Sequence, residues 1–242
     1  MSLPTNKILI LDTETTGLDP KKDSIIEVAA ILVDLNHKRI ECQRSGLIYA
    51  LTNQDSEKIT GISQLMLDGV KSAFDDPFNS IKIMAKQSLC VIAHNAEFDK
   101  GFVEAKGIVL SGINNLPLEW ICSYRDFNYD IQTENKKLST LAEAYSVDSG
   151  GAHRALSDVT MLAHILFKVP NIEEQIFCAI ESKKKPEIKI ISLAPFDQKE
   201  EVKKAGFRWN PIDKTWWKNI RAANESEVNK IIGSFGFDVK IT

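Results

Sequence analysis

Two carboxylates two positions apart follow a short apolar run near the start of the chain. Lys7–Leu11 is predicted to form a buried strand, and Asp12 and Glu14 come directly after it. Side chains alternate across a strand, so both carboxylates point to the same face. A buried pair of like charges is costly unless a proton or a cation neutralises it. The spacing therefore indicates a metal site, and a polar strand end leading into the turn at Gly17 is the alternative.

A second acidic residue lies in a similar position further along the chain. Leu89–Ala93 is predicted to be a buried strand that runs into a helix over Glu97–Lys106, and Asp99 falls in the first turns of that helix. An acidic residue there can also serve only the helix dipole, a role that fits Glu97 better. Asp99 is therefore a candidate to join the first pair of carboxylates.

The third candidate element pairs a histidine with an aspartate. His153 and Asp158 are five residues apart, which on a regular helix rotates them about 140° beyond a full turn. They can converge only if His153 lies on the preceding loop or first turn while Asp158 projects from the helix. Gly150 and Gly151 would make that loop mobile. A solvent-exposed turn histidine is the alternative.

Strands and alternating helices must position these groups. Further strands are predicted over 24–35 and 38–48. Helical periodicity covers 63–68, 77–86, 137–145 and 153–167, and a helix is possible between Glu173 and Ser182. Strands first, then strand-helix alternation, predict an α/β layer fold. We assign 1–170 to this domain, 171–186 to a linker and 187–242 to a second, smaller domain.

The three elements together identify a family resemblance. The motifs DTETTG, HNAEFD and HRALSD resemble, in order and in spacing, those of the DEDDh 3′–5′ exonucleases, the DnaQ-like group that contains polymerase proofreading subunits and ribonuclease T. The resemblance covers about residues 6–170. It implies a ribonuclease-H-like fold with a mixed five-stranded sheet flanked by helices. Val159 departs mildly from the pattern, since Ala is common there.

The resemblance also implies the roles of the acidic residues. Asp12, Glu14, Asp99 and Asp158 would bind two divalent ions, and His153 would be the general base. Carboxylate oxygens favour Mg²⁺ or Mn²⁺ over zinc. Two such ions about 4 Å apart can hold the attacking and leaving oxygens of a phosphodiester displacement. An imidazole can accept a proton at neutral pH.

Substrate-binding residues follow from the same carry-over. The terminal nucleotide would be held around Thr15, Gly17 and Leu18. Thr60 and Ile62 would line or wedge the terminal bases, and Asn95 and Phe98 would frame the sugar or base. For Phe102, four residues further along the helix, a place in the core is the better interpretation.

The C-terminal segment has the pattern of a separate module. Strands and helices predicted over 187–193, 198–205, 207–210, 215–220, 225–234 and 237–241 give the order β-α-β-β-α-β of a ferredoxin-like unit. Its sequence resembles a K-x-x-G-x-x-W-[DN]-P…K-x-W pattern appended to primase-like, helicase-like and plasmid-transfer proteins. That resemblance implies nucleic-acid contacts from Arg208, Lys214, Trp217 and Lys218; a protein-docking domain is the alternative. Adjacent Trp216 and Trp217 cannot both be core, because strand side chains alternate.

Composition excludes some classes of protein. The 242 residues are 43% hydrophobic and 26% charged, the ordinary balance of a globular protein. No apolar run approaches a membrane span, and no signal peptide is expected. The four cysteines lack paired spacing, which favours reduced, mostly buried thiols of a cytoplasmic protein. Residues 183–242 hold 13 basic and 8 acidic side chains, against 17 and 25 before them.

These observations predict a metal-dependent 3′–5′ exonuclease that hydrolyses single-stranded DNA 3′ ends to nucleoside 5′-monophosphates, of the proofreading or repair type. The alternatives are an RNA 3′-end-trimming exoribonuclease and a non-catalytic nucleic-acid-binding module. The expected partners are a single-stranded 3′ end and a DNA polymerase or repair complex, with no membrane contact. The expected cofactor is two Mg²⁺ or Mn²⁺ ions.

Overall fold

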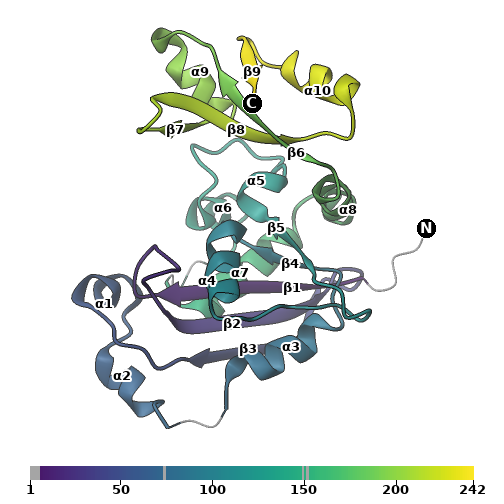
Figure 1. Ribbon diagram of the computed structural model, residues 1–242. Coiled ribbons are helices and arrows are strands. Elements are labelled where there is room, and N and C mark those ends of the chain that lie inside the picture. The colour runs from purple at the N-terminus through teal and green to yellow at the C-terminus, as the bar shows by residue number, and fades with distance from the viewer. Residues whose placement is uncertain (1–5, 73–74, 149, 151–152) are drawn as a thin grey trace. The chain divides into compact units, whose positions relative to one another are not determined.

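A computed structural model describes residues 6–72, 75–148, 150 and 153–242 (Figure 1). Gly151, one of the two glycines expected to loosen the loop before His153, lies outside the described residues. The chain divides into two compact units, Met1–Phe177 and Cys178–Thr242. The division falls within α8 (Ile172–Lys183), a helix in the segment predicted as a linker.

The larger unit contains a mixed five-stranded sheet. In the order β3-β2-β1-β4-β5, its strands are Arg39–Leu47, Ile25–Asp34, Lys7–Thr15, Cys90–Ala93 and Glu119–Cys122. The first three are antiparallel neighbours, and β4 runs parallel to both β1 and β5. Strand β2 is buried along its whole length, which explains its nearly continuous apolar sequence. The predicted α/β class and five-stranded sheet are confirmed.

Helices of the larger unit begin where the sequence supplies capping groups. The side chains of Asn53, Ser63 and Asp76 accept hydrogen bonds from the first backbone N–H groups of α1, α2 and α3. The helices are α1 (Gln54–Thr60), α2 (Gln64–Gly69), α3 (Pro77–Ala85), α4 (Ala96–Ala105), α5 (Ser123–Asp126), α6 (Leu138–Ala144) and α7 (Ala155–Leu166).

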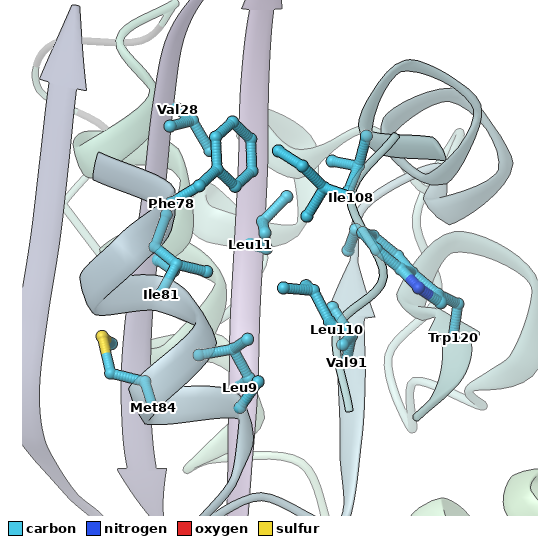
Figure 2. Packing of buried hydrophobic residues seen from close by; sticks show 14 of the residues in the cluster. Leu9, Leu11, Val28, Phe78, Ile81, Met84, Val91, Ile108, Leu110 and Trp120 are labelled. Carbon is cyan, nitrogen blue, oxygen red and sulfur yellow. The ribbon is translucent and has the colours of Figure 1, made fainter. Parts of the chain in front are cut away.

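One face of the sheet packs against α3 and α4. Phe78, Ile81 and Met84 of α3 belong to one cluster with Leu9 and Leu11 of β1, and Figure 2 shows Phe78 and Ile81 beside Leu11. Phe102 of α4 belongs to the same cluster and is 2% exposed, as predicted for a core residue. The odd-numbered positions of β1 therefore face α3 and α4.

The even-numbered positions of β1 face α7, which packs on β1 and β2. Asp12 and Glu14 continue this even series. Glu14 pairs with Glu27 of β2, whose carboxylate accepts the backbone N–H of Ala155 at the start of α7. The two catalytic candidates on β1 thus share the face that α7 covers.

The smaller unit contains a four-stranded antiparallel sheet in the order β7-β8-β6-β9. Its elements are β6 (Glu187–Ser192), the short 3₁₀ turn Phe196–Gln198, α9 (Lys199–Lys204), β7 (Arg208–Asn210), β8 (Thr215–Arg221), α10 (Glu225–Ile232) and β9 (Val239–Ile241). Val202 of α9 and Val228 of α10 pack against Ile190 and Ile220 of the sheet. Both helices therefore cover the same face (Figure 1). The order of elements along the chain matches the predicted β-α-β-β-α-β unit.

The four cysteines are free thiols, as expected. Cys90 and Cys122 are buried, but Cys42 and Cys178 are exposed, so the prediction that most are buried holds for only half of them. Among the described residues, no helix has the length and apolar character needed to cross a membrane.

Candidate active site

Three carboxylates meet where β1 ends beside α7. One ligand oxygen from each of Asp12, Glu14 and Asp158 lies within 4.8 Å of the others. Asp12 and Glu14 reach this point because they share one face of β1, and Asp158 projects from the first turn of α7. The ladder with β2 shifts register between Glu14 and Thr15, an irregularity that ends the regular strand beside the site.

The electrostatics of this cluster disfavour three negative charges. Burial raises the pKa of Asp12 well above its usual value, and the charges of Asp99, Glu14, Asp158 and Glu27 raise it further. Burial and the charges of Asp158, Glu27 and Asp99 raise the pKa of Glu14 to about 7, with Arg154 opposing them. Burial likewise raises the pKa of Asp158. Ionising all of these groups requires positive charge at this point.

Asp99 approaches the cluster from the opposite face, on α4. Its Oδ1 accepts two hydrogen bonds from Thr13, one from the backbone N–H at 3.0 Å and one from the hydroxyl at 2.8 Å. Asp99 is 2% exposed, and burial raises its pKa to about 7 although both Thr13 hydrogen bonds lower it. Its charge is the largest electrostatic influence on Asp12. The structure therefore brings Asp99 beside the carboxylates of β1 and fixes one of its two oxygens.

His153 lies on the bend just before α7 and is exposed. Its backbone is left-handed, with φ 67°. Asp158 follows in the first helical turn, so the pair has the loop-then-helix arrangement that their spacing requires. Burial raises the pKa of Asp158, whereas a backbone hydrogen bond from His153 and the charge of its ring lower it. The two residues are therefore close to one another.

An ion pair that sequence reasoning missed anchors this end of α7. Arg154 donates to both carboxylate oxygens of Glu27, from Nη2 at 2.7 Å and from Nε at 3.1 Å. Glu27 also accepts the backbone N–H of Ala155 at 3.1 Å. A signal was present, since Glu27 is the single charged residue inside the apolar stretch 25–33.

The loop after β1 holds the residues expected to grip a terminal nucleotide. The Thr15 hydroxyl donates to the Gly17 carbonyl at 2.6 Å, and Leu18 is 84% exposed. A Cβ at Gly17 would come within 2.5 Å of the Asp23 carboxylate, so only glycine fits there without movement. The loop is tied to α1, because Asn53 Nδ2 donates to the Thr16 carbonyl at 2.7 Å.

The other expected substrate residues divide into exposed and buried groups. Asn95 is exposed with φ 92°, and Phe98 is half-buried with its ring 4.9 Å from that of Phe102. Thr60 is 6% exposed and Ile62 is fully buried against the cluster that contains Ile26 and Leu67. In this structure neither Thr60 nor Ile62 presents a side-chain surface on which a base could lie.

A cavity of about 370 Å³ adjoins the motif at the start of α4. It is lined by His94, Asn95, Tyr124, Lys137 and Leu138. The Nδ1 atom of His94 lies 2.8 Å from the Ser123 hydroxyl, and burial lowers the pKa of His94 to about 4. His94 is therefore a neutral ring in the wall of this cavity.

The C-terminal candidates occupy different places in the smaller unit. Arg208 is exposed, and its guanidinium lies 5.8 Å from the centre of the Trp217 ring. Lys214 lies in the turn between β7 and β8 with φ 51°. Lys218 faces α9 instead, where its Nζ donates to the Ala205 carbonyl at 2.6 Å. Trp216 packs in the core and Trp217 lies on the opposite face, as strand alternation predicted.

Comparison with known proteins places these features in a family. The model of the RNase_T family, described as "Exonuclease", matches residues 9–166. This range includes all four carboxylates and His153. The chain belongs to this exonuclease family.

Individual proteins also resemble this chain in sequence or in fold. The chain is 32% identical over 168 residues to "DNA polymerase III PolC-type" of Caldanaerobacter subterraneus subsp. tengcongensis, covering 67% of this chain and 11% of the polymerase. It spans only 11–12% of the length of the first polymerases that it matches. Exonuclease I of E. coli, solved with a dT13 oligonucleotide, matches at TM-score 0.54 and 15% identity over 78% of this chain and 49% of that one. A 3′-exonuclease solved in recognition of a histone mRNA stem-loop matches at TM-score 0.54 and 18% identity over 73% and 66%. Both structures share the fold.

Proposed function

We propose that this protein is a divalent-metal-dependent 3′–5′ exonuclease that hydrolyses single-stranded DNA 3′ ends to nucleoside 5′-monophosphates. The observation that carries the proposal is the convergence of Asp12, Glu14 and Asp158 within 4.8 Å. Asp99 is close enough for its charge to raise the pKa of Asp12, and His153 is close enough to lower the pKa of Asp158. Carboxylates held together at this electrostatic cost favour a metal-dependent enzyme over a non-catalytic binding protein.

The chemistry of the donors fits divalent cations. The cluster offers carboxylate oxygens, which are the ligands that Mg²⁺ and Mn²⁺ prefer, and no thiolate lies in it. The raised pKa values of Asp12 and Glu14 have the same origin, namely buried carboxylates without enough positive charge nearby. Asp12, Glu14 and Asp158 would hold the cations directly, and Asp99 would join them.

Bound cations would neutralise the scissile phosphate and make an attacking water more acidic. The protein's residues do the remainder. His153, exposed on its bend, would accept the proton of the attacking water. Thr13 holds the Asp99 carboxylate in place through two hydrogen bonds. Leu18 and the backbone around Gly17, in the loop that Asn53 ties to α1, would contact the terminal nucleotide.

DNA is the substrate that the relatives favour, because the matching polymerases synthesise DNA by their name. The same relatives support a setting in replication or repair with a polymerase as partner. RNA is the second candidate, since one protein with the same fold recognises an mRNA stem-loop.

The test is release of nucleotides from matched DNA and RNA 20-mers with either free or 3′-phosphorylated ends. We expect 5′-monophosphates from the free DNA end with Mg²⁺ or Mn²⁺, slower release from RNA, and none with EDTA. A product with a 3′-phosphate, or cleavage that ignores the state of the 3′ end, would overturn the proposal. Asp12→Asn is the matched inactive control, because it removes one ligand charge at nearly constant volume.

A further inference from the structure

The sheet of the smaller unit has one face that its helices do not cover. Helices α9 and α10 pack on the face that carries Ile190, Lys218 and Ile220. The alternate positions of the strands point the other way. Lys189, Arg208 and Lys240 on that second face are exposed, and Trp217 is half-buried.

Four side chains form a row across this second face, one from each strand. Arg208 of β7 pairs with Trp217 of β8, which pairs with Ile191 of β6, which pairs with Lys240 of β9. We call Arg208, Trp217, Ile191, Lys240 and the neighbouring Lys189 the open-face row. Its centre is an indole beside an aliphatic side chain, and a cation stands at each edge.

Cations already lie against the indole. The Nζ atom of Lys189 is 5.5 Å from the centre of the Trp217 ring, and the Arg208 guanidinium is 5.8 Å from it. The carboxylate of Glu187 shares this face, but Arg221 pairs with it at 2.5 Å. The open-face row therefore places cationic side chains around a flat aromatic ring.

We propose that the open-face row binds single-stranded DNA, with one base stacked on Trp217 and phosphates on Arg208, Lys189 and Lys240. The choice of DNA rests on the proposed function, because the strand would be the one whose 3′ end is hydrolysed. A single strand carries flat bases and phosphates in turn, which matches an aromatic centre with cationic edges. An acidic peptide could pair with the same cations, but its carboxylates offer no flat ring to stack on Trp217 at the centre of the row.

This surface differs from a simple basic patch in two ways. Lys218 is not part of it, because its Nζ is committed to the Ala205 carbonyl on the helix face. Lys189 and Lys240 are part of it, although neither belongs to the Trp-rich motif in the sequence. The charged residues of the open-face row lie together because of the strand register, not because they are close in the sequence.

The experiment measures binding of the full chain to a 5′-fluorescein dT30 strand in EDTA, so that no hydrolysis occurs. Without metal the carboxylates of the active site repel phosphate, so the measured affinity reports mainly the remaining surface. We expect Trp217→Ala to weaken binding at least about fivefold, since base–aromatic stacking contributes roughly 1–3 kcal/mol. Trp217→Phe, which keeps a ring, should restore most of the affinity.

The phosphate contacts have their own measurement. Lys189→Glu and Lys240→Glu, each made singly, should lower the slope of log affinity against log salt by about 0.7 for the phosphate that the surface no longer neutralises. Lys204→Glu is the charge-matched control, because Lys204 is exposed on α9 and outside the open-face row. Its slope should stay close to the wild type.

Several results would overturn the proposal. Unchanged affinity in Trp217→Ala would exclude a stacking surface on this face, and an equally lowered salt slope in Lys204→Glu would exclude phosphate contacts specific to the open-face row. Tighter binding of a matched rU30 strand would assign the surface to RNA. Because binding is measured without metal, these results stand apart from the exonuclease proposal, which is tested by nucleotide release in the presence of metal.

Discussion

Arg154 and Glu27 form a two-pronged ion pair between α7 and β2, with Nη2 and Nε of the arginine 2.7 and 3.1 Å from the two carboxylate oxygens. Glu27 lies directly across the ladder from Glu14, a metal-ligand candidate, and like charges in such a pair repel. Arg154 offsets this repulsion and lowers the pKa of Glu14. The pair therefore links the strand that carries Glu14 to the helix that carries Asp158.

This relationship predicts that Glu27→Ala weakens metal binding without removing a ligand. The start of α7 would lose its acceptor at the Ala155 N–H, and Asp158 would lose its fixed position. Removing a supporting residue of this kind costs about 10- to 100-fold in metal affinity. Calorimetric titration with Mn²⁺ gives the affinity. Glu104→Ala, which removes an exposed ion pair with Lys100, is the control and should match the wild type; equal Mn²⁺ affinity in both variants would contradict the positioning role.

The stability of the metal-free protein should fall as pH rises. Glu14 and Asp99 have pKa values of about 7 in the folded state, above their ordinary values of 4.5 and 3.8. A group whose pKa is higher in the folded than in the unfolded state contributes its full stabilisation at pH values below the unfolded-state pKa. This contribution is lost as the pH rises through the folded-state pKa. The loss should therefore extend from about pH 4 to about pH 7. Thermal unfolding in EDTA between about pH 5 and 8 measures it.

The same groups must lose their protons when a cation binds. Saturating Mg²⁺ should therefore flatten this pH dependence, and Mn²⁺ affinity should increase with pH. Asp12→Asn removes the charge at the centre of the cluster, so it should raise the metal-free unfolding temperature while abolishing hydrolysis. An Asp12→Asn protein that is less stable than the wild type in EDTA at pH 8 would contradict the repulsion.

His153→Ala should lower kcat by about 10²- to 10⁴-fold, the usual contribution of a positioned base. Mn²⁺ affinity should stay within a few-fold of the wild type, because no metal ligand is removed. His164→Ala is the control, since His164 is exposed on the same helix and its ring lies beside Phe167. Full activity in His153→Ala would show that this residue is only part of a loop.

Thr13→Val should change the pKa of Asp99 by removing a single hydroxyl group. The valine has nearly the same shape but lacks the hydroxyl that donates to Asp99 at 2.8 Å, and this hydrogen bond lowers the pKa of Asp99. The pKa of Asp99 should rise further, so the acidic limb of the profile of kcat/KM against pH should move to higher pH. Thr13→Ser keeps the hydroxyl and should leave the limb in place. Coincident profiles for the two variants would exclude this role.

The sequence predicted those parts of the structure that depend on local pattern. The run 7–11 and the alternation after it placed Asp12 and Glu14 on one face, and the spacing of His153 and Asp158 required a loop followed by a helix. The short strand Glu119–Cys122 was not located, because four residues give too little periodicity to distinguish a strand.

Interactions between distant segments could not be predicted in the same way. The Thr13–Asp99 hydrogen bonds join residues 86 positions apart, and the Glu27–Arg154 pair spans 127. Their geometry depends on strand register and helix packing, which the pattern of one segment does not specify. Burial of Ile62 has the same origin, since the residues around it come from β2 and α2.

Lys218 is expected to stabilise the smaller unit and to contribute little to binding of nucleic acid. Its ammonium group donates to the Ala205 carbonyl and lies 5.4 Å from the centre of the Phe235 ring, and burial lowers its pKa. Lys218→Met keeps the aliphatic stem but removes the donor to that part-buried carbonyl, and a typical hydrogen bond contributes about 0.5–1.5 kcal/mol. Urea unfolding followed by tryptophan fluorescence should show this loss of stability, while the salt dependence of dT30 binding stays that of the wild type.

Lys189→Met should do the reverse, with unchanged stability and a lower salt slope, because Lys189 is exposed on the open-face row. A lower salt slope in Lys218→Met at full stability would instead make Lys218 a phosphate contact, as its place in the Trp-rich motif implies.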